Sequence, residues 1–300
     1  MLSRLVRGEK RPKCTAAGEC VRALWRALHG LLPALTASEY TIMPDHVHLL
    51  LLVDYDRDPA FNPLVFLHWF MEESGRMIAE SNGGAQTPRL PAEMRRTYCP
   101  GGSGGESLSF ARFWEDRFWP DLSFDARQLK AIRTYIRNNP LRAFWKRDNP
   151  DMFVVRQHFR HPVLDPSFSW SACGDLSLLG NPFLLPVRLT RRKTVAEHEE
   201  EIAAVVGKAG QGWIPVSGFL SPGEKELYRR LRALPRARWI KTMAQGLPPR
   251  YDPSLEDSRF LAEHRALLLS ALPIGEPFDW NACHLMNALA EDMGRRAWAR

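Results

Sequence analysis

Hydrophobic residues recur at helical spacing in three stretches of the N-terminal half of the chain. The first stretch predicts an amphipathic helix over 18–32, because its apolar positions are three or four residues apart. These positions are Val21, Leu24, Trp25 and Leu28. The second stretch predicts a helix over 63–80 that has a proline in its first turn. The third predicts a helix over 126–138, which starts after an aspartate that can cap it and ends at Asn139-Pro140.

Between the first two predicted helices the pattern is extended. Residues 40–43 and 46–53 are mostly apolar, and the intervening Pro44-Asp45 fits a break between two strands or a bend in one strand. The segment that follows His46 is almost continuously apolar, and it therefore predicts a buried central strand.

The composition of the chain changes after about Pro166. The segment 166–194 contains several Pro and Gly residues and ends near Arg191-Arg-Lys193, so we interpret it as a linker or docking segment. Beyond it, helical and extended patterns alternate over 195–300, which predicts a small parallel α/β domain. We therefore expect an N-terminal domain over 1–165, a linker, and a smaller C-terminal domain.

The charge balance favours an anionic partner. The chain has a formal net charge of +7 and a pI near 9.3, and nucleic acid is the commonest partner of basic proteins. The alternative is that the charge only keeps the protein in solution. The five cysteines include no CxxC pair, which argues against a zinc ribbon or a disulfide framework. The longest apolar run, Leu49–Val53, is too short for a membrane span, and we expect a cytoplasmic, nucleoid-associated protein without a membrane partner.

Two histidines in the predicted central strand suggest a metal site. His46 and His48 are two residues apart, so in a strand both imidazoles point to one face while Val47 points to the other. Two neutral imidazoles suit manganese, zinc or nickel, and they accept magnesium when oxygen ligands join them. The alternative is that both histidines simply lie on a half-exposed sheet.

A tyrosine and an asparagine on the third predicted helix can belong to the same site. Tyr135 and Asn139 are four residues apart and therefore project from one face. A tyrosine with its ordinary pKa near 10 is a weak nucleophile and needs a metal-bound phosphate, a cation or a base to activate it. The alternative is that Tyr135 is a core aromatic residue and Asn139 ends the helix ahead of Pro140.

Basic and aromatic residues are mixed together over 110–147. The basic residues are Arg112, Arg117, Arg127, Lys130, Arg133, Arg137, Arg142, Lys146 and Arg147. The aromatic residues include Trp114, Phe118, Trp119, Phe124 and Trp145. Basic groups follow phosphates while aromatic rings stack on unpaired bases, so the mixture indicates single-stranded nucleic acid. The alternative is a solvated helix face above an aromatic core.

These features together resemble a known family. Met43-Pro-Asp-His-Val-His-Leu-Leu-Leu51 resembles the "MPNHVHLLL" signature of HUH-type single-strand DNA transposases. Tyr135-Ile-Arg-Asn-Asn-Pro-Leu-Arg-Ala143 resembles their "YIxxNPxxA" signature, and Phe113-Trp-Glu-Asp-Arg-Phe118 is similar to the tract before their catalytic helix. The subgroup most similar to residues 1–165 is that of the REP-associated tyrosine transposases. One departure is Asp45 in place of the usual asparagine, which can hydrogen-bond a ligand histidine or only shape the turn.

The resemblance implies an α+β fold, with a ferredoxin-like antiparallel sheet that has helices on one face. Its first strand must come from residues 1–13. The resemblance also implies a divalent cation, Mg²⁺ or Mn²⁺, and its ligands are His46, His48 and Asn139. Tyr135 is then the nucleophile that forms a 5′-phosphotyrosine, and the substrate is single-stranded DNA beside a hairpin of a repetitive palindromic element. Such proteins act as monomers or homodimers. The DNA-binding candidates, chosen by position, are Arg117, Arg133, Arg137 and Arg142.

Three functions fit these residues. The first is a metal-dependent single-stranded DNA endonuclease and strand transferase, that is, a transposase. The second is a domesticated hairpin DNA-binding protein that no longer cuts, and the third is a replication or conjugation nickase. In the C-terminal domain, Ile214–Glu224 is faintly similar to Rossmann-like modules of DNA-processing and nucleotide-sensing proteins. It lacks the GxGxxG pattern, so we expect no cofactor there, and its helix start either receives a phosphate or has no ligand.

Overall fold

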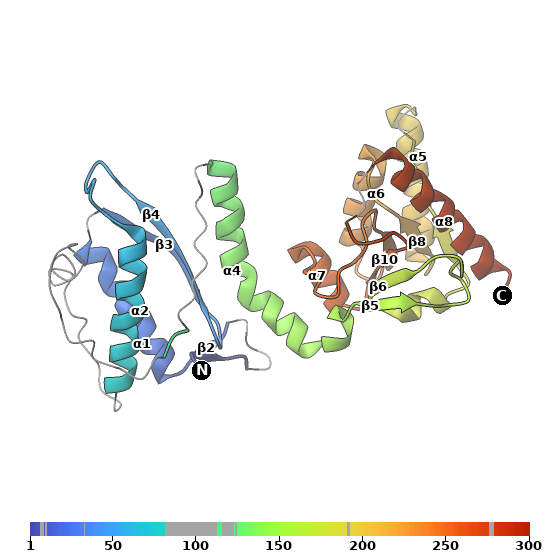
Figure 1. Ribbon diagram of the computed structural model, residues 1–300. Helices are drawn as coiled ribbons and strands as arrows, with labels where there is room; N and C mark the ends of the chain where they lie inside the picture. The colour runs from blue at the N-terminus through green and yellow to red at the C-terminus, as the bar shows by residue number, and fades with distance from the viewer. Residues whose placement is uncertain are drawn as a thin grey trace. The chain divides into compact units, whose positions relative to one another are not determined.

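The computed structural model describes residues 1–6, 9, 11–32, 34–81, 113–115, 123, 125–190, 193–275 and 279–300. These residues form two compact units, unit 1 (Met1–Phe144) and unit 2 (Trp145–Arg300), which are both drawn in Figure 1. Among the helices of these residues, none has both the length and the apolar composition that crossing a bilayer requires.

Unit 1 is built on a long β-hairpin covered by two helices (Figure 1). Strand β3 (Leu35–Ile42) pairs antiparallel with β4 (Val47–Val53), and the turn between them contains Pro44-Asp45. Helices α1 (Ala16–Leu31) and α2 (Pro63–Glu80) bury their apolar faces against the hairpin. Their bounds lie within two residues of those predicted from the apolar spacing. The predicted break at Pro44 is the turn of the hairpin.

The N-terminal strands do not complete the expected sheet. Strand β1 (Ser3–Arg4) pairs with β2 (Lys13–Cys14) in a separate two-stranded sheet. The Leu2 amide donates to the Pro44 carbonyl, which holds β1 beside the turn of the hairpin. Within the described part of unit 1, the strands therefore form two small antiparallel sheets, and the single ferredoxin-like sheet expected from the resemblance is not formed.

Helix α4 (Ala126–Asp148) is longer than predicted and runs through Pro140. A proline inside a helix removes one backbone hydrogen bond and usually ends or kinks the helix. Here Ile136, Pro140 and Phe144 are spaced four residues apart and form the buried stripe of the helix. The burial of this stripe offsets the missing hydrogen bond, and the prediction that the helix ends at Asn139 is wrong.

Unit 2 contains a six-stranded mixed sheet in the order β5-β6-β10-β9-β8-β7. The strands are β5 (Arg156–Phe159), β6 (Trp170–Gly174), β7 (Leu184–Pro186), β8 (Ile214–Ser217), β9 (Trp239–Thr242) and β10 (Ala266–Ser270). Strands β7 to β10 are parallel, β6 is antiparallel to β10, and β5 is antiparallel to β6. The crossover helices are α5 (Val195–Gly210), α6 (Pro222–Ala233) and α7 (Leu255–Ala262), and the C-terminal helix is α8 (Trp280–Trp298).

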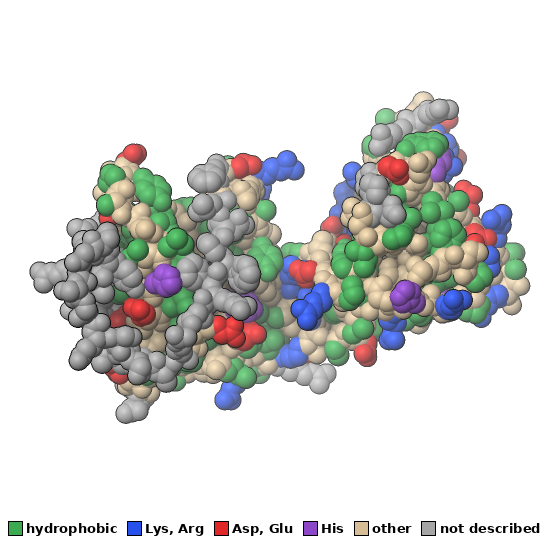
Figure 2. All heavy atoms as spheres, viewed as in Figure 1, with side chains coloured by type: hydrophobic (Ala, Val, Ile, Leu, Met, Phe, Trp, Pro, Cys, Tyr) green, Lys and Arg blue, Asp and Glu red, His purple; other side chains and the backbone are tan. Residues whose placement is uncertain are grey.

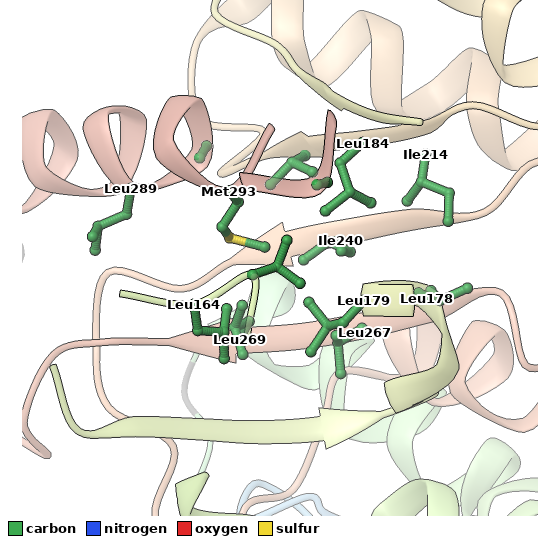
Figure 3. Packing of buried hydrophobic residues seen from close by; sticks show 14 of the residues in the cluster. Leu164, Leu178, Leu179, Leu184, Ile214, Ile240, Leu267, Leu269, Leu289 and Met293 are labelled. Carbon is green, nitrogen blue, oxygen red and sulfur yellow. The ribbon is translucent and has the colours of Figure 1, made fainter. Parts of the chain in front are cut away.

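The two faces of this sheet bury two separate hydrophobic clusters. Along β10, Leu267 and Leu269 belong to the cluster beneath α8, whereas Leu268 belongs to the cluster beneath α5, α6 and α7. Figure 3 shows the α8 side, where Leu289 and Met293 lie over the strands. Every residue of β10 is buried, because both faces of this central strand are covered.

The segment expected to be a linker belongs to this sheet. Residues 166–194 contain β6, which pairs with β10 along Ser171–Gly174, and β7, which forms the opposite edge. They also contain a short 3₁₀ helix, Leu176–Gly180. Proline is tolerated on an edge strand, where its missing N–H breaks no ladder bond, and Pro186 occupies such a position. Unit 2 therefore begins at Trp145 and is larger than the domain predicted over 195–300.

Candidate functional site

The two histidines of the hairpin face each other at the start of β4. His46 directly follows the turn and His48 pairs with Thr41 of β3. Their Nε2 atoms are 3.1 Å apart, and the two rings lie nearly perpendicular, at 85°. The strand geometry therefore places both imidazoles on one face of the hairpin, which is the arrangement that the two-residue spacing predicts.

Helix α4 brings an amide to the same point. Asn139 Nδ2 lies 2.6 Å from His48 Nε2, although the two residues are 91 positions apart in the chain. Burial lowers the pKa of His48 to about 4, and the neighbouring His46 adds to this effect, so the ring is neutral near pH 7 and its Nε2 accepts the amide proton. A half-turn of the amide would exchange its nitrogen for its oxygen and direct an oxygen donor at the histidines.

An acidic neighbour fixes the orientation of the first histidine. Asp45 Oδ1 lies 2.7 Å from His46 Nδ1, so the ring donates its Nδ1–H to the carboxylate and directs Nε2 towards His48. Histidines that bind metals are usually oriented by such a carboxylate. Asp45 is the position that departs from the transposase signature. It was expected either to hydrogen-bond a ligand histidine or only to shape the turn, and the structure shows the hydrogen bond.

Tyr135 lies at the edge of this group and is not a core residue. Its side chain is 44% exposed, and its ring meets the His48 ring edge-on with 5.5 Å between centroids. The Arg142 guanidinium lies 5.8 Å from the centre of the tyrosine ring. An exposed aromatic ring with a cation above it can stack on an unpaired base.

Two of the predicted DNA-binding arginines contact the hairpin. Arg133 donates to Ser38 Oγ at 3.0 and 3.2 Å, and Arg137 forms an ion pair with Glu39, so both guanidinium groups tie α4 to β3. Ser38 and Glu39 could not be predicted as part of the site, because no local spacing connects them with a helix almost a hundred residues later. The fourth candidate, Arg117, lies outside the described residues.

The donor set fits a divalent cation only in part. His46, His48 and Asn139 offer two imidazole nitrogens and one amide oxygen, and among the described residues no group of three His, Cys, Asp or Glu side chains is close enough to hold a metal. A cation on these three donors would keep open positions for water or phosphate oxygens. Such a site suits phosphate binding better than permanent structural metal binding.

The helix start in unit 2 directs backbone amides at a carboxylate of the protein itself. The buried carboxylate of Glu224 accepts hydrogen bonds from the backbone amides of Leu189, Leu220 and Ser221. Ser221 completes a capping box with the same residue. The protein's own carboxylate therefore binds backbone amides that an anion would otherwise contact at this helix start.

The comparisons with known proteins find a likeness among solved structures alone. No family model matches the chain, and no curated protein matches it. Among solved structures, the chain is similar to DNA processing protein A from Helicobacter pylori, a structure described for its single-stranded DNA binding mode. The match has 20% sequence identity, covers 48% of this chain and 67% of that chain, and has a TM-score of 0.37.

These comparisons overturn the transposase identification. No family model, of a transposase or of any other family, matches residues 1–165, where both signatures lie, and no curated protein matches the chain. The prediction of a REP-associated tyrosine transposase that cuts and rejoins DNA is therefore wrong. The nucleophilic role of Tyr135 is not tested by these comparisons and stays a prediction.

Proposed function

We propose that this protein binds single-stranded or hairpin DNA without cutting it, and that it holds one backbone phosphate through a divalent cation on unit 1. The proposal rests on one observation, the convergence of His46, His48 and Asn139 beside the exposed ring of Tyr135. The alternative hypothesis of a non-cleaving hairpin-binding protein depends on the same residues.

The three donors would hold Mn²⁺ or Mg²⁺. The cation supplies positive charge to a phosphodiester oxygen, and the protein supplies the orientation of its ligands. His46 is directed by Asp45, and His48 is neutral, so both lone pairs are available to a cation. Asn139, whose Nδ2 faces His48, would rotate its amide by a half-turn and so offer its oxygen to the cation. No step in this binding requires a bond of the DNA to break.

Tyr135 and Arg142 would contact the nucleotide next to the bound phosphate. The tyrosine ring is exposed at the edge of the histidine pair and can stack on an unpaired base, an interaction worth about 1–3 kcal/mol. Arg142 lies over the same ring and can pair with the following phosphate. The excess of basic residues, with a net charge of +7, favours the approach of a polyanion.

The test is fluorescence anisotropy with a labelled oligo(dT) and a labelled hairpin, in Mn²⁺ and in EDTA. We expect EDTA to weaken binding by about tenfold, and a His46→Ala/His48→Ala variant to bind equally in both conditions. His284→Ala, a histidine of α8 in unit 2, is the matched control and keeps the metal effect. Equal affinities of the wild-type protein with and without the cation would disprove the metal-bridged contact.

A second measurement addresses cleavage directly. Protein and labelled DNA are incubated with Mn²⁺ and separated on a denaturing gel, with Tyr135→Phe in parallel. We expect no covalent complex and intact DNA. A covalent band that Tyr135→Phe abolishes would refute the non-cleaving proposal.

A further inference from the structure

Three aromatic side chains meet at one edge of the sheet in unit 2. Phe183 directly precedes β7, Trp213 directly precedes β8, and Trp298 is the last residue of α8. Because β7 and β8 are parallel, the residues before them lie at the same end of the sheet. The ring centroids are 5.1 Å apart for Phe183 and Trp213, 6.2 Å for Phe183 and Trp298, and 6.3 Å for the two tryptophans.

This aromatic cluster is exposed although its rings are large. The side chains of Trp298 and Phe183 are 68% and 44% exposed, and Trp213 is half-buried. The planes of the two tryptophans differ by only 23°. Ala297, the residue before Trp298, belongs to the core beneath the cluster and is only 3% exposed. Large apolar rings gathered on a surface mark a contact for a partner more often than isolated ones do.

The backbone beneath the rings is held by hydrogen bonds. The Ile214 amide donates to the Phe183 carbonyl at 2.9 Å, which joins the starts of β7 and β8. Asn181 Nδ2 donates to the Gly212 carbonyl at 3.3 Å, and Asn181 Oδ1 accepts from the Phe183 amide at 2.7 Å. The rings therefore project from a fixed edge, and binding to them requires little ordering of the chain.

A positive charge lies against the cluster, and the helix that ends in it carries basic residues in its last turn. Lys208 Nζ lies 5.3 Å from the centre of the Trp213 ring, and Arg295 and Arg296 are in the last turn of α8, before the C-terminal Arg300. Asp292 forms ion pairs with both of these arginines. On the visible face of unit 2, Lys and Arg side chains lie among hydrophobic ones, also near the end of the chain at the right (Figure 2). Cations around exposed rings suit a ligand that has both flat bases and phosphates.

We propose that Phe183, Trp213 and Trp298 form a stacking surface for the unpaired bases of single-stranded DNA, with Lys208 beside its phosphates. This inference rests on the proposed function and extends it to a second contact on unit 2. A protein partner for the same rings would need a complementary acidic, apolar surface. The mixture of rings and cations fits nucleic acid directly.

The experiment compares Trp298→Ala with Trp280→Ala. Trp280 is 71% exposed and lies at the opposite end of the same helix, so it is a matched control. The probes are oligo(dT) and an abasic oligonucleotide of equal length, which has phosphates but no bases. We expect the wild-type protein to bind oligo(dT) at least about fivefold more tightly than the abasic strand, because each stacked base contributes this much or more. Trp298→Ala removes part of that preference, because the ring of Tyr135 can still stack, Trp298→Phe restores some of the loss, and Trp280→Ala leaves the preference unchanged.

The outcomes separate this inference from the proposed function. If the wild-type protein binds neither oligo(dT) nor the hairpin, both fail, and if it binds the hairpin alone, only the stacking surface fails. If the His46→Ala/His48→Ala variant loses binding while Trp298→Ala behaves like Trp280→Ala, the stacking surface is disproved and the proposed function stands. If only Trp298→Ala loses binding, the stacking surface stands and the histidine site is not the contact. Sedimentation velocity is measured in parallel, and a dimer that Trp298→Ala dissociates without any change in DNA affinity would assign the rings to self-association and overturn the inference.

Discussion

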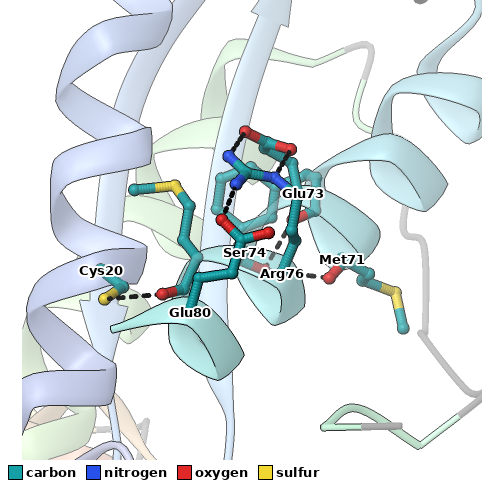
Figure 4. A network of polar contacts seen from close by, with 8 residues as sticks. Cys20, Met71, Glu73, Ser74, Arg76 and Glu80 are labelled. Carbon is teal, nitrogen blue, oxygen red and sulfur yellow. Dashed lines mark hydrogen bonds and ion pairs between the residues drawn. The ribbon is translucent and has the colours of Figure 1, made fainter. Parts of the chain in front are cut away.

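A buried ion pair in α2 gives a quantitative prediction for the stability of unit 1. Arg76 and Glu73 are each 5% exposed, and Figure 4 shows their side chains facing each other. Arg76 Nε donates to Glu73 Oε2 at 2.9 Å, and Arg76 Nη2 donates to Glu73 Oε1 at 2.6 Å. Glu80 also pairs with this guanidinium. The perturbation is Glu73→Gln, which removes the charge and replaces one acceptor oxygen with an NH₂ group directed at the arginine donors.

The expected cost follows from the burial of the arginine. Breaking a buried pair by removing one partner costs about 3–5 kcal/mol, because the remaining charge is left uncompensated. Glu80 retains part of the compensation, so we expect a loss near the lower limit, about 3 kcal/mol in the free energy of opening of unit 1. Replacement of both partners by apolar residues, Glu73→Leu/Arg76→Met, removes the buried charge and is expected to recover most of this loss.

Hydrogen–deuterium exchange of α2 in the full chain measures this change for unit 1 separately from unit 2. A loss of about 3 kcal/mol corresponds to a roughly 150-fold faster exchange of the most protected amides. Glu72→Gln, an exposed neighbour on the same helix, is the control and should change exchange by less than about threefold. The reasoning is refuted if Glu73→Gln exchanges like the control, or if the double variant is as unstable as the single one.

Two further predictions concern the histidine pair and a cysteine of unit 2. Asp45→Ala should weaken Mn²⁺ binding by about tenfold in calorimetric titration, because His46 loses the acceptor that orients it, whereas Asp56→Ala should not. Burial raises the pKa of Cys173 from 9.0 to about 11, so between these values the unfolded chain has lost a proton that the folded chain retains, and stability falls as the pH rises. The free energy of unfolding of unit 2, measured in urea, should fall by about 2–3 kcal/mol by pH 11. A Cys173→Ala variant whose free energy of unfolding falls as steeply with pH would contradict this prediction.

The sequence determined those features that depend on neighbours along the chain. The spacing of apolar residues predicted α1 and α2, and the alternation over 195–300 predicted the parallel strands and crossover helices. The two-residue spacing placed His46 and His48 on one face, and the four-residue spacing placed Tyr135 and Asn139 on one side of α4. Each of these follows from a repeat of the backbone, which is the same in every protein.

Short motifs did not determine the family. Two signatures in the expected order indicated a transposase, and the comparisons contradict that identification. A pair of histidines on a strand and a tyrosine near an asparagine on a helix are local arrangements that different proteins can share. The function of such a group depends on the residues and ligands around it.

Only the tertiary structure decided which distant segments meet. It joined Asn139 to His48, directed Arg133 to β3, and gathered the aromatic cluster from three segments of unit 2. It also placed β6 beside β10, within a segment whose Pro and Gly content had suggested a linker. Such contacts form because buried apolar surface and satisfied hydrogen bonds over the whole unit outweigh local preferences, as at Pro140, where the packing of Ile136 and Phe144 keeps the helix continuous.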